Sequence, residues 1–230
     1  YARIDGFLGE DGLIYLNDPN TTSGMMPSSF FFHQAAEIGL NPSQFLSYII
    51  RISLQERIHT QLQISQFENL LRRLDENLHN QAIEDKQKKK VAVILGGYSY
   101  ERHISVESGR NIYEKLASSE KYHPFPVFLT GDASSYQLYK IPINFMLKDN
   151  ADDIKEKIEH FHIHPYLKNL RHEAQSITAK YSSASYHYEP QLLSFEDLKK
   201  EADIVFIALH GRPGEDGNIQ KRLEEISVPY

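Results

Sequence analysis

The run VAVILGG at residues 91–97 most constrains what this chain can fold into. Five consecutive apolar residues followed by a glycine pair predict a buried strand that ends in a sharp turn. The patterned stretch that follows predicts a helix, and strand, glycine turn and helix in this order begin a parallel α/β domain. Two more buried strands are expected at residues 124–130 and 202–209, the second ending in another glycine-rich turn. The expected fold class from residue 89 onward is therefore α/β.

Two side chains, Glu101 and His210, lie just beyond strand ends on one edge of this expected sheet. Ligands of open α/β sheets bind at the carboxyl ends of the strands, so this edge is where a site would be built. Structural interpretations also stay open: Glu101 would interact with a helix dipole, and His210 would bond a loop carbonyl. Gly96 and Gly97 do not form a dinucleotide fingerprint, because the third correctly spaced glycine is missing.

The first twenty residues predict a β-hairpin, because YARIDGFL and LIYLNDPN flank an Asp-Gly turn signal. With a two-residue turn, Asp5 lies opposite Asp18 and Arg3 lies opposite Asn20, all on one face. Opposed carboxylates repel unless a cation lies between them, and two acids with an amide suit Mg²⁺ or Mn²⁺. The alternative is a solvent-facing polar set in which Arg3 neutralises Asp5.

Three helices are expected before the α/β domain. A loop of small residues at 21–30, either an anion-binding loop or a plain connector, leads into helices at 29–40 and 41–58. The second of these begins with Asn41 as an N-cap. Leucines at three- and four-residue spacing then predict an amphipathic bridging helix over residues 62–87. The pattern does not say whether this helix packs on its neighbours or on a second chain.

Between the second and third expected strands lies a long span, residues 131–198, which is expected to be an insertion that contains a helix at 166–181. His160, His162 and His164 alternate near its middle. No acid or cysteine stands at a convincing metal-ligand spacing from them, so surface histidines are favoured over a zinc site.

Composition excludes several functional classes. The net charge of −6 is spread along 230 residues, so no basic field indicates nucleic acid and no lysine-rich amphipathic stretch indicates a membrane surface. There is no cysteine, and the apolar runs are too short to span a membrane. A cytoplasmic setting is expected. The first residues already read as a strand with no initiating methionine, and the last stop where another strand should begin, so a longer polypeptide is expected.

Three motifs together resemble one family. ARIDGFL with IYLNDPNTTSGMMPSS resembles the end of the catalytic ATP-grasp domain of D-alanine:D-alanine ligases. VAVILGGYSYERHIS and FIALHGRPGEDGNIQKRLEEISVPY resemble the amino-terminal domain of the same family. The resemblance implies that residues 1–57 end an ATP-grasp domain, 58–88 form a helical linker, and 89–230 form a parallel-sheet, Rossmann-like substrate domain with the insertion at about 131–198.

The resemblance also implies roles for ten residues, in two groups. The phosphate-side group consists of three magnesium ligands (Asp5, Asp18 and Asn20), an arginine that stabilises the acyl phosphate (Arg3), and a backbone contact to it (Gly24). The substrate group consists of contacts to the second D-alanine's carboxylate (Ser29 and Phe30), the acid that holds the first D-alanine's ammonium (Glu101), and two neighbours of that subsite (Ser105 and His210).

The implied function is ATP-dependent ligation of two D-alanines to D-alanyl-D-alanine, for peptidoglycan precursors, through an acyl phosphate. ATP, D-alanine and Mg²⁺ or Mn²⁺ are the implied small molecules, and the remainder of the ligase chain is the implied partner. A homodimer stays open. The alternative function is a non-catalytic, degenerate ligase copy that serves as a scaffold.

Several positions depart from the family pattern. Asp18 stands where the family usually has glutamate, Ser23 replaces a usual proline, and His103 replaces a usual second glutamate. The order of the two parts is reversed, and the central lobe with its ATP-binding lysines has no counterpart. The simplest interpretation is the junction of a tandem ligase, in which the two residue groups complete different active sites. A circular permutation, in which they share one site, is the alternative.

Overall fold

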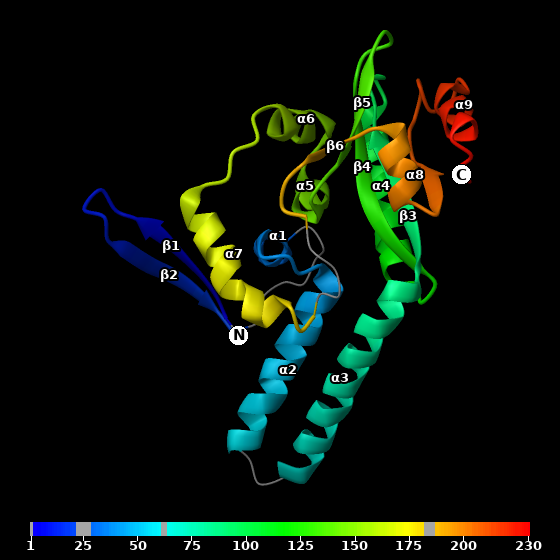
Figure 1. Ribbon diagram of the computed structural model, residues 1–230. Coiled ribbons are helices and arrows are strands. Elements are labelled where there is room, and N and C mark those ends of the chain that lie inside the picture. The colour runs from blue at the N-terminus through cyan, green and yellow to red at the C-terminus, as the bar shows by residue number, and fades with distance from the viewer. Residues whose placement is uncertain (1, 22–28, 61–63, 182–186) are drawn as a thin grey trace.

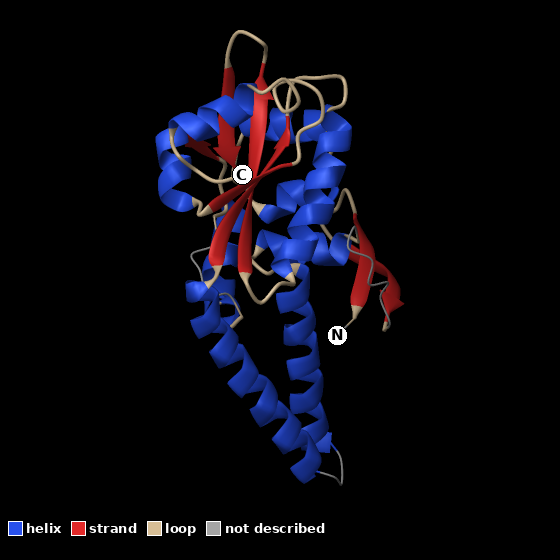
Figure 2. Cartoon of the chain, turned by 90° about the vertical axis from the view of Figure 1, so that its right-hand side faces the viewer, coloured by secondary structure: helices blue, strands red, loops and turns tan. Residues whose placement is uncertain are grey.

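The computed structural model describes residues 2–21, 29–60, 64–181 and 187–230. A two-stranded hairpin comes first, three helices follow, and a five-stranded sheet covered by helices completes the chain (Figure 1). Figure 2 shows two of the helices forming a long arm below the sheet, with the hairpin to one side of the helical layer. The order of elements therefore agrees with the hairpin, helices and α/β domain expected from the sequence.

The hairpin pairs β1 (Arg3–Leu8) with β2 (Ile14–Asn20) in antiparallel register. Its turn is one residue longer than expected: Gly9 N–H donates to the Leu13 carbonyl at 2.8 Å, which encloses a three-residue loop ending at Gly12, whose φ is 77°. A β-bulge then shifts the register between Asp5 and Gly6. The expected two-residue turn was wrong. The expected pairing of Asp5 with Asp18 is nevertheless present, because the extra turn residue and the bulge offset one another.

One face of the hairpin is wholly apolar. Leu8 pairs with Ile14 and Gly6 pairs with Leu16, so after the bulge Ile4, Leu8, Ile14 and Leu16 share this face, and each is more than half exposed. The opposite face carries the charged residues. The hairpin is thus amphipathic, and its polar face is the one to consider for chemistry.

Helices α1 (Phe30–Glu37) and α2 (Pro42–Thr60) follow, as expected. Asn41 and Gln44 form reciprocal side-chain to backbone hydrogen bonds of 2.9 Å, which caps α2. Phe45 is buried and makes an edge-to-face contact with Phe31 at 4.6 Å between ring centroids. Apolar spacing, cap and packing therefore agree on this helix.

The bridge is the helix α3 (Ile64–Glu84), followed by a 3₁₀ turn, Asp85–Gln87. It runs back along α2, and the two form an antiparallel helical arm (Figures 1 and 2). Arg51 of α2 donates two hydrogen bonds to Asp75 of α3, at 2.8 and 3.3 Å, and Lys180 reaches the same carboxylate at 3.1 Å. The bridging helix thus packs on its own chain.

The sheet has the strand order β6-β5-β4-β3-β7. Strands β3 (Lys89–Gly96), β4 (Tyr122–Gly131) and β7 (Ile204–Ile207) are parallel, which confirms the three strands expected from the sequence. Strands β5 (Tyr136–Lys140) and β6 (Gln191–Leu193) add to one edge in antiparallel pairing. The sheet is therefore mixed, and residues 131–198 supply two of its strands.

Helices cover both faces of the sheet. Along β3, Ala92 and Ile94 point into a core shared with α8 (Phe195–Glu201) and α9 (Asn218–Glu225), whereas Val93 points into the opposite core. That opposite core is shared with α4 (Arg102–Ala117), α5 (Ile143–Lys148) and α6 (Ala151–Glu159). A strand that is apolar on both faces requires this three-layer arrangement.

The segment 1–57 docks on the α/β domain through Glu37, at the end of α1. Arg171 of α7 (Pro165–Thr178) donates to the Glu37 carboxylate and to its carbonyl, both at 2.9 Å. Asn144 of α5 donates to the other carboxylate oxygen at 2.6 Å. One partly buried acid of the first segment therefore joins two helices of the second.

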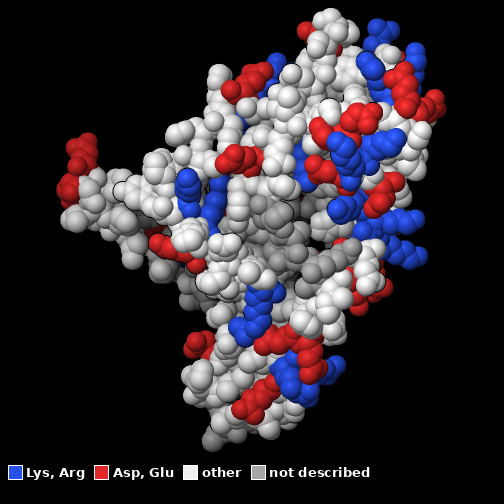
Figure 3. Space-filling model, in the orientation of Figure 1, with Lys and Arg blue, Asp and Glu red and all other residues white. Residues whose placement is uncertain are grey.

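Among the alternating histidines, His164 is the N-cap of α7, where its Nδ1 accepts from the Tyr166 N–H at 3.3 Å. Within the described residues, no group of three or more histidines and acids is arranged to hold a metal ion. The described helices include none that combines the length and the apolar character needed to cross a membrane. Acidic and basic side chains are interspersed over the face shown in Figure 3.

Candidate functional site

The polar face of the hairpin brings together Arg3, Asp5, Asp18 and Asn20. Asp5 is the direct partner of Asp18, and Arg3 is the partner of Asn20. Arg3 Nη2 lies 3.3 Å from Asp5 Oδ2, and Asn20 Nδ2 donates to Asp18 Oδ2 at 3.0 Å. The two carboxylates thus stand side by side, each held by a different neighbour.

A pocket of about 540 Å³ lies beside this face, between β1 and the start of α1. Arg3, Asp5, Ser29 and Phe30 line it, and all four were predicted from the sequence to be site residues. Two of its polar atoms, Arg3 Nε and Ser29 Oγ, are buried and have no hydrogen-bond partner among the described residues. Buried donors without partners are costly, so the pocket is suited to an oxygen-rich anionic group.

Gly24 and Ser23 lie outside the described residues. The predicted backbone contact from Gly24 therefore stays a prediction.

The second group of predicted residues lies where β3 and β7 end. Gly96 and Gly97 have φ angles of 91° and 100°, conformations that favour glycine, and they turn the chain toward α4. Glu101 is the N-cap residue of α4. Its carboxylate lies so close to Gly211 that a β-carbon at this glycine would be 3.4 Å from Glu101 Oε2. Because Gly211 follows His210, this close approach places Glu101 beside the loop that carries the histidine.

Serine hydroxyls hold this edge together. Ser105 is fully buried: its Oγ accepts from the Gly96 N–H at 2.9 Å and donates to the Ala208 carbonyl at 3.0 Å. Ser105 therefore joins the ends of β3 and β7. The predicted role of this hydroxyl as a substrate neighbour stays a prediction, because both of its hydrogen bonds go to the backbone.

Two further serines were missed by sequence reasoning. Ser99 Oγ donates to the His210 carbonyl at 2.7 Å, and Ser108 Oγ lies 2.9 Å from His210 Nε2. Ser108 stands seven residues after Glu101, two helical turns further along α4, and that spacing is the signal that could have found it. The imidazole of His210 is thus oriented by α4.

Arg102 and His103, next to Glu101, contact α6 instead of the site. Arg102 forms two hydrogen bonds to Asp152, at 2.7 and 2.9 Å, and these hold the pKa of that carboxyl below its usual value. His103 Nε2 lies 3.5 Å from the same carboxylate. His103 therefore contacts a neighbouring helix from the first turn of α4.

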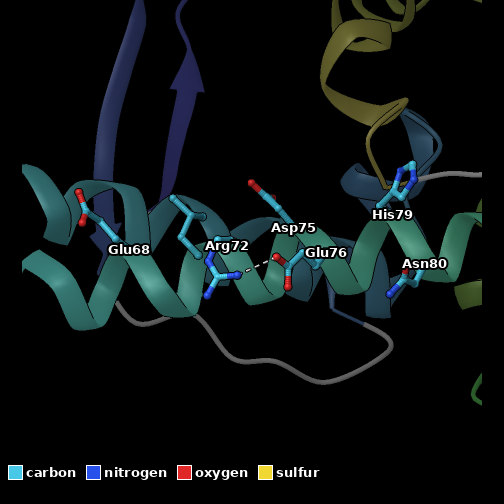
Figure 4. A pocket seen from close by; sticks show the side chains of 7 residues that line it. Glu68, Arg72, Asp75, Glu76, His79 and Asn80 are labelled. Atoms are coloured by element: carbon cyan, nitrogen blue, oxygen red, sulfur yellow. Dashed lines mark hydrogen bonds and ion pairs between the residues drawn. The ribbon is translucent and has the colours of Figure 1, made fainter.

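The two groups of predicted residues do not line one pocket. The pocket beside the hairpin is lined by residues of β1 and of the start of α1, and neither Glu101 nor His210 is part of it. Figure 1 shows the hairpin on the far side of α7 from the five-stranded sheet. A larger hollow of about 650 Å³ lies along α3, where Arg72 and Glu76 form an ion pair (Figure 4), and it contains none of the predicted residues.

The fold and the two residue groups define a mixed α/β protein with an acid-bearing hairpin and a ligand edge at the ends of parallel strands. The chain belongs to the D-alanine:D-alanine ligase family, since residues 90–230 match the family described as "D-ala D-ala ligase N-terminus". Residues 1–51 match "D-ala D-ala ligase C-terminus". The carboxyl-terminal part therefore precedes the amino-terminal part, which confirms the reversed order inferred from the motifs.

Similar proteins carry the same family name. The D-alanine--D-alanine ligase of Caldicellulosiruptor bescii is 32% identical over 143 residues, which are 62% of this chain and 33% of that protein. The ligase of Borrelia hermsii is 30% identical over 142 residues, covering 62% and 31%. The structure of the D-alanine-D-alanine ligase from Coxiella burnetii aligns with a TM-score of 0.34 at 26% identity, covering 62% of this chain and 35% of that one. The chain spans about a third of the length of these relatives.

Proposed function

We propose that this chain contributes two parts of an ATP-dependent ligase that joins two D-alanines. In this reaction the carboxylate of the first D-alanine attacks the γ-phosphorus of ATP, which yields an acyl phosphate and ADP. The amine of the second D-alanine then attacks the acyl carbon, forms the peptide bond and displaces inorganic phosphate. Negative charge develops on phosphate oxygens in each step, and the residues proposed here would stabilise that charge.

The pocket beside the hairpin carries this proposal. Arg3 and Asp5 of the hairpin line it together with Ser29, which precedes α1. It contains two buried polar atoms that lack partners among the described residues. Arg3 would hold an oxygen of the acyl phosphate through its guanidinium, because a planar fork matches a phosphate group. Ser29 would donate to the carboxylate of the second D-alanine, and this also satisfies its buried hydroxyl.

The residues of the hairpin fit Mg²⁺ or Mn²⁺. Asp5 and Asp18 offer exposed carboxylates from directly paired positions, and their repulsion would be relieved by a bound cation. The Asn20 Nδ2 already donates to Asp18, which leaves its amide oxygen to serve as a ligand. All three donors are oxygen, the ligand type that both ions prefer. When bound, the ion would supply neutralising charge to the phosphates of ATP.

At the other group, Glu101 would hold the ammonium of the first D-alanine, with His210 beside it. The two residues meet where Gly211 approaches Glu101, and Ser108 fixes the ring of His210. Because the two groups line separate surfaces, we propose that they complete different active sites, as at the junction of a tandem ligase. This part of the proposal rests on the fold, and on the position of α7 between them.

A comparison of two charge-neutralising variants tests the proposal. Asp5→Asn removes one proposed metal ligand, whereas Glu10→Gln removes an acid from the turn of the same hairpin. The affinity of the chain for Mn²⁺ can be measured from the electron paramagnetic resonance signal of the ion. This affinity should fall at least ten-fold in Asp5→Asn and stay unchanged in Glu10→Gln. Equal Mn²⁺ affinity in both variants would contradict the metal site.

A further inference from the structure

A second cavity, of about 240 Å³, lies at the end of the sheet where β3 and β4 begin. The first turn of α2 forms one wall through Asn41 and Gln44, and β4 forms another through His123 and Phe125. The candidate ligand edge lies at the other ends of these strands. The cavity is therefore separate from both groups of site residues, and it lies where segment 1–57 meets the α/β domain.

Three polar groups line this cavity without hydrogen bonds to described residues: the Tyr113 hydroxyl and the imidazoles of His123 and His187. Tyr113 is only 6% exposed, so water has little access to its side chain other than through the cavity. The cavity thus presents donors to whatever fills it.

The charge of the lining favours an anion. Lys90 and Lys140 provide two ammonium groups and Glu201, which is paired with Lys140, provides one carboxylate. Pro124, Pro126 and Pro142 form the remaining walls and suit an apolar body, whereas the ring of Phe125 is covered on one side by the Lys140 ammonium, 4.9 Å from the ring centroid.

We propose that this cavity binds a small organic carboxylate, whose oxygens accept hydrogen bonds from Tyr113, His123 and His187 while its apolar body packs on the prolines of the wall. Since a water molecule occupies about 30 Å³ in the liquid, the cavity holds roughly eight water volumes, or a ligand about as large as benzoate. Such a ligand would contact both segments and would stabilise their association.

The histidines provide a direct readout. Burial lowers the pKa of both His123 and His187. For His123 the lysines Lys88, Lys90 and Lys140 lower it further and Asp85 opposes them; for His187, Lys140 lowers it and Glu201 opposes it. A bound carboxylate stabilises the charged imidazolium, so it should raise both values.

The test uses benzoate as the probe and the full 230-residue chain with labelled histidines. In nuclear magnetic resonance titrations, saturating benzoate should raise the pKa of His123 and His187 and leave that of exposed His79 unchanged. Benzylamine, of similar shape but opposite charge, should raise neither. No benzoate-dependent change at His123 and His187, or an equal response to benzylamine, would overturn the proposal.

Two variants locate the binding. Tyr113→Phe should weaken benzoate binding about ten-fold, because a hydrogen bond to a charged group is lost, whereas Tyr166→Phe, at a tyrosine that is 79% exposed on α7, should not. If Tyr113→Phe fails to fold, Lys90→Gln, at an exposed position of the rim, should still weaken binding several-fold at low salt. Unchanged affinity in the folded Tyr113→Phe variant or in Lys90→Gln would contradict the assignment.

Discussion

Asp5 and Asp18 are direct cross-strand partners, although the turn that joins their strands is one residue longer than a two-residue hairpin loop. The bulge between Asp5 and Gly6 restores the pairing. A bulge at this position has a consequence for chemistry, because it keeps both carboxylates and the Arg3 guanidinium on one face. Bulges commonly redirect side chains next to functional sites.

The first prediction concerns the shorter acid at position 18. Because the family resemblance implies a glutamate there, Asp18→Glu should extend the carboxylate toward Asp5 and raise the affinity for Mn²⁺ about three-fold or more. Isothermal titration of the chain with MnCl₂ would measure this change. A loss of affinity in Asp18→Glu would show that the hairpin is adapted to the shorter side chain.

The second prediction concerns Asp75, which joins α2 and α3. Hydrogen bonds from Arg51 lower the pKa of Asp75 below its ordinary value of 3.8. A carboxylate whose folded pKa is lowered stabilises the fold above its unfolded pKa, and the stabilisation is lost as pH falls through the folded pKa. Stability should therefore fall below about pH 4, partly through this group.

Variants on the same helix separate this effect from general charge changes. Asp75→Asn should lower the free energy of unfolding at pH 7 by about 1 kcal/mol and flatten its decline below pH 4, because the pair is partly exposed. Glu76→Gln, which removes only the exposed pair with Arg72, should change little. Chemical denaturation at pH 7 and pH 3 would measure both, and equal losses in the two variants at pH 7 would contradict the role given to Asp75.

The third prediction concerns the docking of the two segments. Glu37→Ala removes the acid that binds Arg171 and Asn144, and Arg171 keeps only 11% of its side chain exposed. Arg171 keeps its hydrogen bond to the carbonyl of residue 37 but loses the carboxylate, which should cost roughly 2–3 kcal/mol, less than for a fully buried pair. Glu107→Ala, which breaks a pair whose acid is 65% exposed, is the matched control. Thermal unfolding would compare them, and similar melting temperatures would show that Glu37 does not hold the segments together.

The fourth prediction concerns Ser105. Ser105→Ala leaves the Gly96 N–H and the Ala208 carbonyl without their partner at the ends of two buried strands, which should cost about 1–3 kcal/mol. Ser47→Ala removes an exposed hydroxyl that bonds within its own helix and should be nearly neutral. Urea denaturation would distinguish them. Equal stability of the two variants would mean that Ser105 is not a structural link.

The strands of the central sheet were predictable because of their composition. Residues 91–95 are all apolar and branched or small, and a strand buried on both faces requires this pattern. By contrast, β5 has the sequence YQLYK, in which only Leu138 is fully buried, and β6 is three residues long. Neither carries a clear local signal, because pairing makes them strands and not local preference: β5 pairs with β4, and β6 pairs with β5.

The arrangement of the candidate site residues was predictable only in part. The pairing of Asp5 with Asp18 followed from counting, although the bulge that produces it leaves no mark in the pattern of residues. The contacts at the sheet edge were not predictable from the sequence either. Ser105 is buried between two strands and Ser108 contacts His210, and both contacts arise from tertiary packing. The Glu37 contacts join positions more than one hundred residues apart, and no local pattern announces them.

The most direct test of the proposed ligase reaction is the release of inorganic phosphate from ATP in response to D-alanine, measured on the polypeptide as the cell makes it. We expect release to require both D-alanine and Mg²⁺, to be lost in Asp5→Asn, and to persist in Glu10→Gln. Glu101→Gln should raise the D-alanine concentration needed for half-maximal release without changing that for ATP. Phosphate release that is independent of D-alanine, absent altogether, or unaffected by Asp5→Asn would contradict the account and favour a non-catalytic scaffold.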